Sequence, residues 1–198
     1  MPNKFTEITF TDTVKKVQEA QGSRKNYARL ETDGQMIHHV LGERESTFIA
    51  LRDSFYMASV GETGWPYVQH RGGPAGFVKV LDEKHIGFAD FRGNRQYVSV
   101  GNFMTDNRVA LFFMDYLNKT RLKMLGRVGL VDAGDTDMLS RLAVPDYRGR
   151  VERGILITIE GFDWNCPAHI TQRLTLDEVA EVIIPLQDRI RELEARQP

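Results

Sequence analysis

WPYVQHRGGPAG, residues 65–76, is a strand-like run that leads into a glycine-rich turn. Arg71 stands at the end of the run, directly before Gly72 and Gly73. Glycine lets a backbone come close to a ligand, so N–H groups and a guanidinium can face the same anion with few side chains between them. The stretch therefore predicts a strand that ends in an anion-binding turn.

Two further segments combine a predicted strand with basic residues. Residues 90–95 read DFRGNR and follow an apolar run, and residues 121–127 read RLKMLGR. In the second segment Arg121, Lys123 and Arg127 share one parity, which places them on one face of an extended chain. If the three segments are strands of one small sheet, their cations can converge on one anionic ligand.

From Phe55 onwards, short runs of β-branched and aromatic residues alternate with Gly, Pro and Asp. This alternation is typical of a β-meander, and GETGWP (61–66) has the composition of a hairpin connection. The predicted strands cover 54–60, 67–71, 77–82, 83–90, 108–116, 121–132 and 153–164. A barrel of short strands is the expected outcome.

Helical spacing and capping residues predict helices over 9–20, 43–52, 94–104, 135–142 and 177–196. In the second helix Phe48, Ile49 and Leu51 are expected to point inward. No linker or repeat divides the chain, so one domain of mainly β (α+β) class is predicted over 1–198. Its expected parts are a helical arm (1–52), a barrel core (53–165) and a C-terminal segment with a helix (166–198).

The last predicted helix carries an apolar stripe. Its members are Val179, Val182, Ile183, Leu186, Ile190 and Leu193. Pro185 interrupts the pattern and is expected to kink or restart the helix. A stripe of this kind usually packs against protein, so it is interpreted as a packing surface that could support a dimer.

The composition excludes several classes of function. The chain has 198 residues, with Lys plus Arg at 26 and Asp plus Glu at 27, giving a net charge of −1. This balance argues against general nucleic-acid binding and in favour of a small anionic ligand for the arginine clusters. Cys166 is the only cysteine, which rules out an intrachain disulfide and a cysteine-based zinc site.

Familiar catalytic and targeting motifs are missing from the sequence. The five histidines lack metal-ligand spacing, and there is neither a nucleophile elbow nor a Walker loop. The first residues, MPNKFTEITF, do not have the pattern of a signal or transit peptide, and no apolar run reaches membrane-spanning length. A cytoplasmic protein is expected, without a membrane or nucleic-acid partner.

Three blocks carry a family resemblance: PYVQHRGGPAGFVKVLD (66–82), FADFRGNRQYVSVGNF (88–103) and RLKMLGRVGLVD (121–132). In this order and spacing they resemble the pyridoxamine 5′-phosphate oxidase-related flavoproteins of the FMN-binding split-barrel family. The resemblance implies a split β-barrel with peripheral helices and FMN as the cofactor. It also implies a homodimer with the flavin at the subunit interface.

The first block resembles the strand that contacts the flavin in this family. Arg71 is the expected ligand contact, and Gln69 or His70 is expected to face the ring or the ribityl chain. Arg71 could instead be a surface ion-pair partner. Removing the charge of Arg71 or Arg95 is predicted to weaken FMN binding without unfolding the protein.

The second block resembles the phosphate-binding turn of the family. Asn94 and Arg95 would meet the phosphate at the N-terminus of the following helix, where the helix dipole favours an anion, with Arg92 and Phe91 beside them. Asn102 is a further candidate, whose amide could bond the ligand or a neighbouring loop.

The third block departs from the true vitamin B6 oxidases. Arg121 stands where those enzymes have a glutamine near the flavin, and Arg127 is a second candidate on the same strand. The alternative is that either arginine balances a carboxylate such as Asp115 or Asp90. Near the C-terminus NCPAHITQR (165–173) offers Gln172 and Arg173, but the substrate motif of the true oxidases is missing.

The expected function is that of an FMN-dependent oxidoreductase acting on an unidentified small substrate. The protein would orient the flavin and compensate its charge, and no side chain stands out as a catalytic acid or base. Two alternatives remain open at this point. One is a flavin- or haem-binding module without turnover, and the other is a deazaflavin-dependent reductase.

Overall fold

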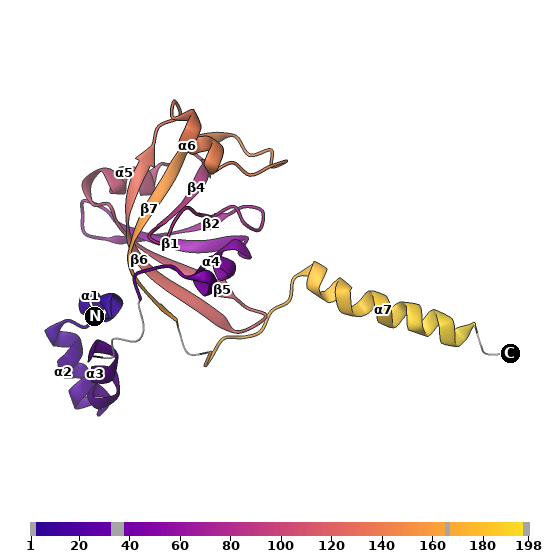
Figure 1. Ribbon diagram of the computed structural model, residues 1–198, viewed down its shortest axis with the longest axis horizontal. Helices are drawn as coiled ribbons and strands as arrows, with labels where there is room; N and C mark the ends of the chain where they lie inside the picture. Colours follow the sequence, from indigo (N-terminus) through magenta and orange to yellow (C-terminus); the bar gives the residue numbers. More distant parts are fainter. Residues whose placement is uncertain (1–2, 33–37, 165–166, 196–198) are drawn as a thin grey trace. The chain divides into compact units, whose positions relative to one another are not determined.

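The computed structural model describes residues 3–32, 38–164 and 167–195 (Figure 1). The chain divides into two compact units, one of residues 1–114 with 121–165 and the other of residues 115–120 with 166–198. Cys166 lies outside the described residues.

The first unit is built on one seven-stranded sheet with the order β2-β1-β5-β6-β7-β4-β3. The strands are β1 (Ser54–Val60), β2 (Pro66–Gly72), β3 (Lys79–Val80), β4 (His85–Phe91), β5 (Arg108–Asp115), β6 (Thr120–Val131) and β7 (Val151–Trp164). β1 pairs antiparallel with β2 and β5, and β7 pairs antiparallel with β4 and β6. The turn between β1 and β2 is the predicted hairpin, closed by the Gly61 N–H, which donates to the Trp65 carbonyl at 3.1 Å.

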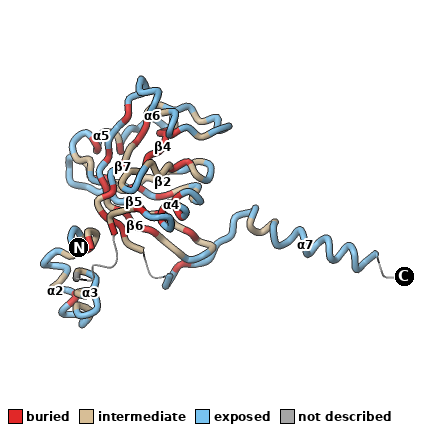
Figure 2. The backbone as a smooth tube through the Cα atoms, in the orientation of Figure 1, coloured by how far each residue is buried: buried red, intermediate tan, exposed pale blue. Residues whose placement is uncertain are grey.

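The sheet curls so that strands far apart in its order meet. Phe55 of β1 packs edge-on against Phe88 of β4 with ring centroids 5.4 Å apart, although three strands lie between them in the sheet. Phe55 also stacks on Phe113 of β5 at 4.7 Å. Figure 2 shows the buried residues concentrated on the strands. These contacts confirm the predicted mainly β, split-barrel fold.

Six helices of the described part of the first unit surround or precede the sheet. They are α1 (Lys4–Thr9), α2 (Asp12–Ala20), α3 (Arg24–Thr32), α4 (Glu43–Ala50), α5 (Val98–Thr105) and α6 (Thr136–Arg141). α1 packs on β7 at Gly161, where a Cβ would lie 2.8 Å from the backbone nitrogen of Phe5. A side chain there would push α1 away from the strand.

Several predicted helices and strands have different bounds in the structure. The helix predicted over 9–20 corresponds to α2, which begins only at Asp12 because Thr11 caps it by accepting a hydrogen bond from the Val14 N–H. The sequence did not predict α1, which precedes it. Leu51 was expected to point inward, but it is 63% exposed because it lies at the C-cap of α4, past the buried face. The strand predicted over 77–82 pairs only at β3, since Phe77 and Val78 enter the core before it.

The second unit contains the segment 115–120 and helix α7 (Leu176–Glu194). α7 begins with a capping box, in which Thr175 and Glu178 bond each other's backbone N–H groups. It continues through Pro185 as one helix, and none of its described residues is buried. Figure 2 shows exposed residues along its length.

Candidate functional site

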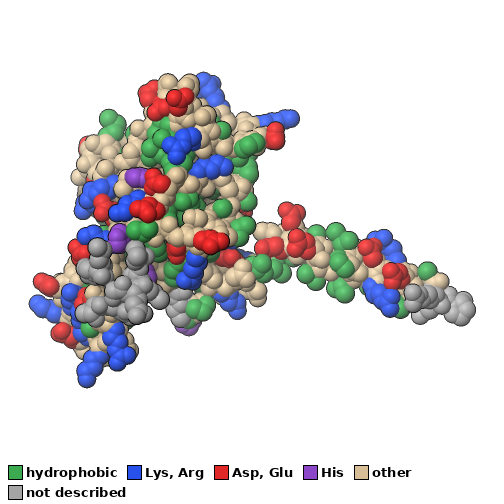
Figure 3. Space-filling view, in the orientation of Figure 1, with side chains coloured by type: hydrophobic (Ala, Val, Ile, Leu, Met, Phe, Trp, Pro, Cys, Tyr) green, Lys and Arg blue, Asp and Glu red, His purple; other side chains and the backbone are tan. Residues whose placement is uncertain are grey.

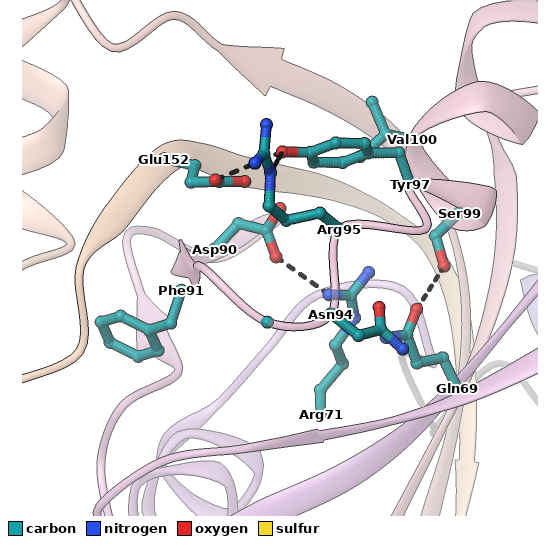
Figure 4. A pocket seen from close by; sticks show the side chains of 11 residues that line it. Gln69, Arg71, Asp90, Phe91, Asn94, Arg95, Tyr97, Ser99, Val100 and Glu152 are labelled. Carbon is teal, nitrogen blue, oxygen red and sulfur yellow. Dashed lines mark hydrogen bonds and ion pairs between the residues drawn. The ribbon is translucent and has the colours of Figure 1, made fainter.

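A cavity of about 230 Å³ opens where β2, the β4–α5 turn and β7 meet. Its lining includes Gln69, Arg71, Asp90, Phe91, Gly93, Asn94, Arg95, Tyr97, Ser99, Val100 and Glu152 (Figure 4). A hollow of about 150 Å³ shares Arg71 with it and continues toward Phe77 and Phe88. The segments 65–76 and 90–95, which sequence analysis selected, thus meet at one place.

The floor of the cavity is a buried ion pair. Arg71 Nη1 of β2 lies 2.9 Å from Asp90 Oδ1 of β4, and the two side chains are 12% and 11% exposed. Arg153 Nε of β7 lies 3.4 Å from the other carboxylate oxygen of Asp90, within ion-pair distance but without hydrogen-bond geometry. One carboxylate therefore faces two guanidinium groups.

Burial dominates the electrostatics of this pair. Desolvation raises the pKa of Asp90, with Arg71 and Arg153 opposing the shift. Desolvation also lowers the pKa of Arg71, with Asp90 opposing it. Both shifts mean that the attraction within the pair does not fully offset the loss of water. Arg71 Nε and Arg153 Nε are in addition buried without a hydrogen-bond acceptor, and of the two arginines Arg71 lines the cavity.

Gln69 is held next to Arg71 on the same face of β2. Residues 69 and 71 are both partly buried, whereas Val68 and His70 are exposed on the opposite face. The Ser99 hydroxyl of α5 donates to Gln69 Oε1 at 2.9 Å. This hydrogen bond fixes the orientation of the Gln69 amide group, including its nitrogen. Figure 4 shows the Gln69 and Asn94 side chains close to Arg71. Three polar side chains therefore gather at one end of the cavity.

The turn from 93 to 97 forms the upper wall of the cavity. Arg95 and Tyr97 have φ values of 62° and 55°, a left-handed conformation that non-glycine residues rarely adopt. Asn94 Oδ1 accepts from the Gln96 N–H at 3.2 Å, and Arg95 Nε donates to the Tyr97 hydroxyl at 3.2 Å. Such strain in a turn before a helix is typical of backbone that is shaped for a ligand.

α5 begins directly after this turn. Its N-cap residue is Tyr97, which makes no side-chain capping hydrogen bond. The first N–H groups of a helix lack intrahelical partners and attract an anion. The helix therefore presents its positive end at the turn that carries Asn94 and Arg95, as the sequence predicts.

Other predicted site residues of the first unit lie outside the cavity. Asn102 donates to the hydroxyl of buried Ser59 at 2.9 Å, a contact with strand β1 and not with the ligand or loop considered for it. Arg127 pairs with Glu160 at 2.9 Å, not with Asp90. The Arg121 guanidinium lies over the Phe112 ring at 5.8 Å, with Nε buried and unpartnered. The third basic segment therefore does not join the other two within one chain.

Three more candidates border the site without facing it. The His70 ring lies edge-on to Tyr56 at 5.6 Å, on the outer face of β2. The Phe91 ring packs on Tyr147 at 4.7 Å, and Figure 4 shows it directed away from Arg71. Arg92 Nε forms an ion pair with Glu152 at 3.4 Å. Of the pair Gln69 and His70, the structure directs Gln69 toward the cavity.

Gln172 and Arg173 belong to the second unit. The Gln172 side chain donates to the Leu117 carbonyl at 2.8 Å, and the Arg173 guanidinium lies 4.9 Å from the Tyr116 ring centroid. Both contacts are made within that unit. Their place in a ligand site stays a prediction.

Sequence analysis missed four residues that shape the site. Asp90, Tyr97, Ser99 and Glu152 all line the cavity. Asp90 had a recognisable signal, because a carboxylate in the apolar run HIGFADF needs a cation once the strand is buried. Glu152 and Ser99 had none, since their partners Arg92 and Gln69 lie far away in the sequence.

Residues 3–32, 38–164 and 167–195 contain no group of three or more His, Cys, Asp or Glu side chains placed to hold a metal ion. Within the same residues, every helix is too short or too polar to cross a bilayer.

The sequence of the barrel matches a known family. The family model for pyridoxamine 5′-phosphate oxidase covers residues 41–163, more than half of the chain. The chain belongs to the pyridoxamine 5′-phosphate oxidase family. The match includes β1 to β6 and all of β7 except its last residue, and hence every residue that lines the cavity. No match was found among curated proteins.

Several solved structures resemble this chain. A variant of HupZ from Group A Streptococcus is 12% identical, covers 63% of this chain and 98% of its own, and has a TM-score of 0.51. A putative pyridoxamine 5′-phosphate oxidase from Lactobacillus delbrueckii is 19% identical, with 63% and 94% covered and a TM-score of 0.49. An FMN-binding protein from Syntrophomonas wolfei is 11% identical, with 75% and 97% covered and a TM-score of 0.45. At these identities the likeness concerns the fold.

Proposed function

We propose that this member of the pyridoxamine 5′-phosphate oxidase family is an FMN-binding oxidoreductase that acts on a small substrate. The observation that carries the proposal is the cavity in which Arg71, Asn94 and Arg95 meet beside the N-terminus of α5. Its donors suit a phosphate joined to a polar chain, because guanidinium groups, an amide and helix N–H groups all bind anionic oxygens. Membership of the family supports the same cofactor.

The residues present fit FMN by their own chemistry. Arg95, Asn94 and the first N–H groups of α5 would hold the phosphate, and Gln69 with Arg71 would hold the ribityl chain or the ring edge. The buried, unpartnered Nε of Arg71 is a donor that such a ligand would satisfy. When bound, FMN supplies hydride transfer at its flavin ring. The chain's part is to orient the cofactor and to balance its negative charge.

A single chain supplies only part of such a site. Ligand pockets usually enclose most of the ligand's surface, whereas the cavity of one chain is lined in part by the exposed residues Gly93, Asn94 and Arg95. The proposal therefore includes a homodimer with the flavin at the interface. Arg121, which lies outside its own chain's cavity, would then be available to the flavin held by a second copy.

An apolar face of the sheet supports this dimer. A depression of about 410 Å³ crosses β1, β2, β5 and β6, and its lining includes Tyr56, Val68, Ala110, Phe112 and Leu125. Val68 is 59% exposed and Tyr56 42% exposed in the single chain. Apolar patches of this kind mark protein interfaces. The charge substitution Val68→Glu is expected to weaken FMN binding, because a buried charge on this face would separate the two barrels.

The proposal is tested by the visible spectrum of the purified protein and the mass of any ligand released by heat. The variant Arg95→Gln is expected to raise the FMN dissociation constant by at least about tenfold, because a charge-assisted hydrogen bond is lost. Arg108→Gln is the matched control, since Arg108 is also exposed and bonded to a neighbouring side chain but lies outside the cavity. A protein that stays colourless with added FMN, or equal affinity in both variants, would overturn the proposal. Turnover with NADH or NADPH and varied acceptors then separates an oxidoreductase from a binding module.

A further inference from the structure

Helix α7 exposes an apolar stripe with a strict seven-residue repeat. The stripe is formed by Leu176, Val179, Ile183, Leu186, Ile190 and Leu193, at alternating steps of three and four residues. These are the a and d positions of three heptads, with Leu176, Ile183 and Ile190 at a. Leu186 and Ile190 are 58% and 54% exposed. Figure 3 shows apolar side chains gathered along α7.

Within the described residues of the second unit, this helix has no packing that accounts for its length. None of its described residues is buried, and Pro185 removes one backbone hydrogen bond from its middle. Most helices in proteins are stabilised by packing of an apolar face more than by intrinsic propensity. A partner for the stripe is therefore needed. Pro185 lies at position c, outside the seam, so it does not interrupt the apolar contacts.

The residue types select the kind of partner. β-branched Ile at a with Leu at d favours two parallel strands, and the second and third heptads have this pairing in Ile183 with Leu186 and in Ile190 with Leu193. Charges flanking the seam agree with the same arrangement. Arg189 is at position g and Glu194 is at the e position five residues later, which is the g-to-e′ spacing of parallel pairs.

We propose that α7 pairs with α7 of a second copy of this chain as a parallel, in-register, two-stranded coiled coil. Each Arg189 would face Glu194 of the other copy, so two-fold symmetry gives two such ion pairs. In the single chain Arg189 contacts Glu192 in an exposed pair at 2.7 Å, a contact that contributes little and is easily exchanged. An antiparallel pair would place g opposite g and lose this complementarity. The coiled coil goes beyond the flavin site and does not depend on it.

The register is tested by disulfide crosslinking in the full-length protein. Cys166→Ser removes the natural cysteine, and Leu193→Cys then places a single thiol at the last d position. A parallel, in-register pair brings the two thiols together, so mild oxidation should give a covalent dimer on non-reducing gels. An antiparallel pair, or a stripe that folds back onto its own barrel, would leave the thiols apart and overturn the proposal.

Two isoleucines of α7 offer a matched control. Ile190 and Ile184 are 54% and 55% exposed in the single chain, but Ile190 is at a and Ile184 at b. In the crosslinking background Ile190→Glu should reduce the rate of dimer formation at least about tenfold, because a charge enters the seam. Ile184→Glu should leave that rate unchanged. Equal effects of the two substitutions would show that the heptad seam is not the contact.

A charge exchange tests the flanking pair. Arg189→Glu should slow crosslinking, and the double variant Arg189→Glu/Glu194→Arg should restore it, because the opposite charges again face each other. Absence of rescue would refute the parallel pairing of these residues. FMN content, measured on the same samples, reports on the cavity and the barrel interface and not on α7, so failure of the coiled coil and failure of the flavin proposal are distinguishable.

Discussion

Arg71 and Asp90 join the two ends of one sheet, with Nη1 and Oδ1 2.9 Å apart on strands that stand first and sixth in its order. The same guanidinium borders the cavity proposed to hold FMN. One residue therefore has a part in barrel closure and in the site. Arg71 is therefore not the exposed surface ion-pair partner that the sequence left open as an alternative.

Truncating Arg71 should destabilise the barrel. Arg71→Met leaves the Asp90 carboxylate buried with Arg153 as its remaining cation, so the free energy of unfolding should fall by about 2–4 kcal/mol. The double variant Arg71→Met/Asp90→Asn should lose less than the two single variants added together, because no unpaired carboxylate remains. Urea unfolding measures both. Additive losses would show that the two side chains are not coupled.

The raised pKa of Asp90 predicts a pH dependence of stability. As pH rises above the ordinary value of 3.8, the unfolded chain releases this proton before the folded chain does. The contribution of Asp90 to folding is therefore complete below pH 3.8 and declines as pH rises through the folded-state pKa. The unfolding free energy of the native protein, relative to Asp90→Asn, should fall over this window. A carboxyl carbon NMR titration of Asp90 at or below the ordinary value would contradict the expectation.

Substitution by alanine should destabilise the protein at one glycine of β6 and have little effect at another. At Gly126, beside the bulge with β7, a Cβ would lie 2.7 Å from the Thr158 carbonyl oxygen and 2.7 Å from Ile157 Cγ2. Gly126→Ala should therefore cost about 1–3 kcal/mol of unfolding free energy. At Gly129 nothing lies within 4 Å, so Gly129→Ala should change stability little. Thermal or urea unfolding of the two variants decides, and equal losses would mean that the bulge can shift.

A substitution at Arg95 should weaken FMN binding without lowering the stability of the protein. Its φ of 62° suits glycine better than arginine. Arg95→Gly should leave the melting temperature unchanged or slightly raised, while the FMN dissociation constant rises at least about tenfold with the lost cation. The melting temperature is measured without FMN, so that the two effects stay separate. A lower melting temperature with unchanged FMN binding would assign Arg95 a structural role instead.

The sequence predicted most strands because their side chains alternate. β1 has the burial pattern of a half-buried strand, with Phe55 and Met57 inside and Tyr56 outside, and such alternation is visible in the letters. Leu51 could not be placed in this way, since its exposure depends on where α4 stops. The length of β3 was overestimated for a related reason. Phe77 and Val78 are apolar because they pack in the core, but they lie outside the paired strand.

The site was predictable where its residues are neighbours in the sequence. Arg71 with its glycines, and Asn94 with Arg95, are local patterns that reflect local backbone geometry. The bonds from Arg71 to Asp90 and from Ser99 to Gln69 were not predictable, because they depend on how the sheet curls. Arg121 and Arg127 show the same limit, since parity along a strand fixes a face but not which neighbours that face meets.

The barrel is a cylinder with a lengthwise slit. Along the other strand borders, backbone hydrogen bonds hold neighbours together, but β2 is an end strand of the sheet and meets β4 through side chains. Among the described residues, widening the slit would break the contact of Arg71 with Asp90 and the aromatic packing behind it, and it would leave the backbone ladder of the sheet intact. The wall of the cylinder is therefore easiest to part beside the cavity, and this is where a large flat ligand could enter without unfolding the sheet.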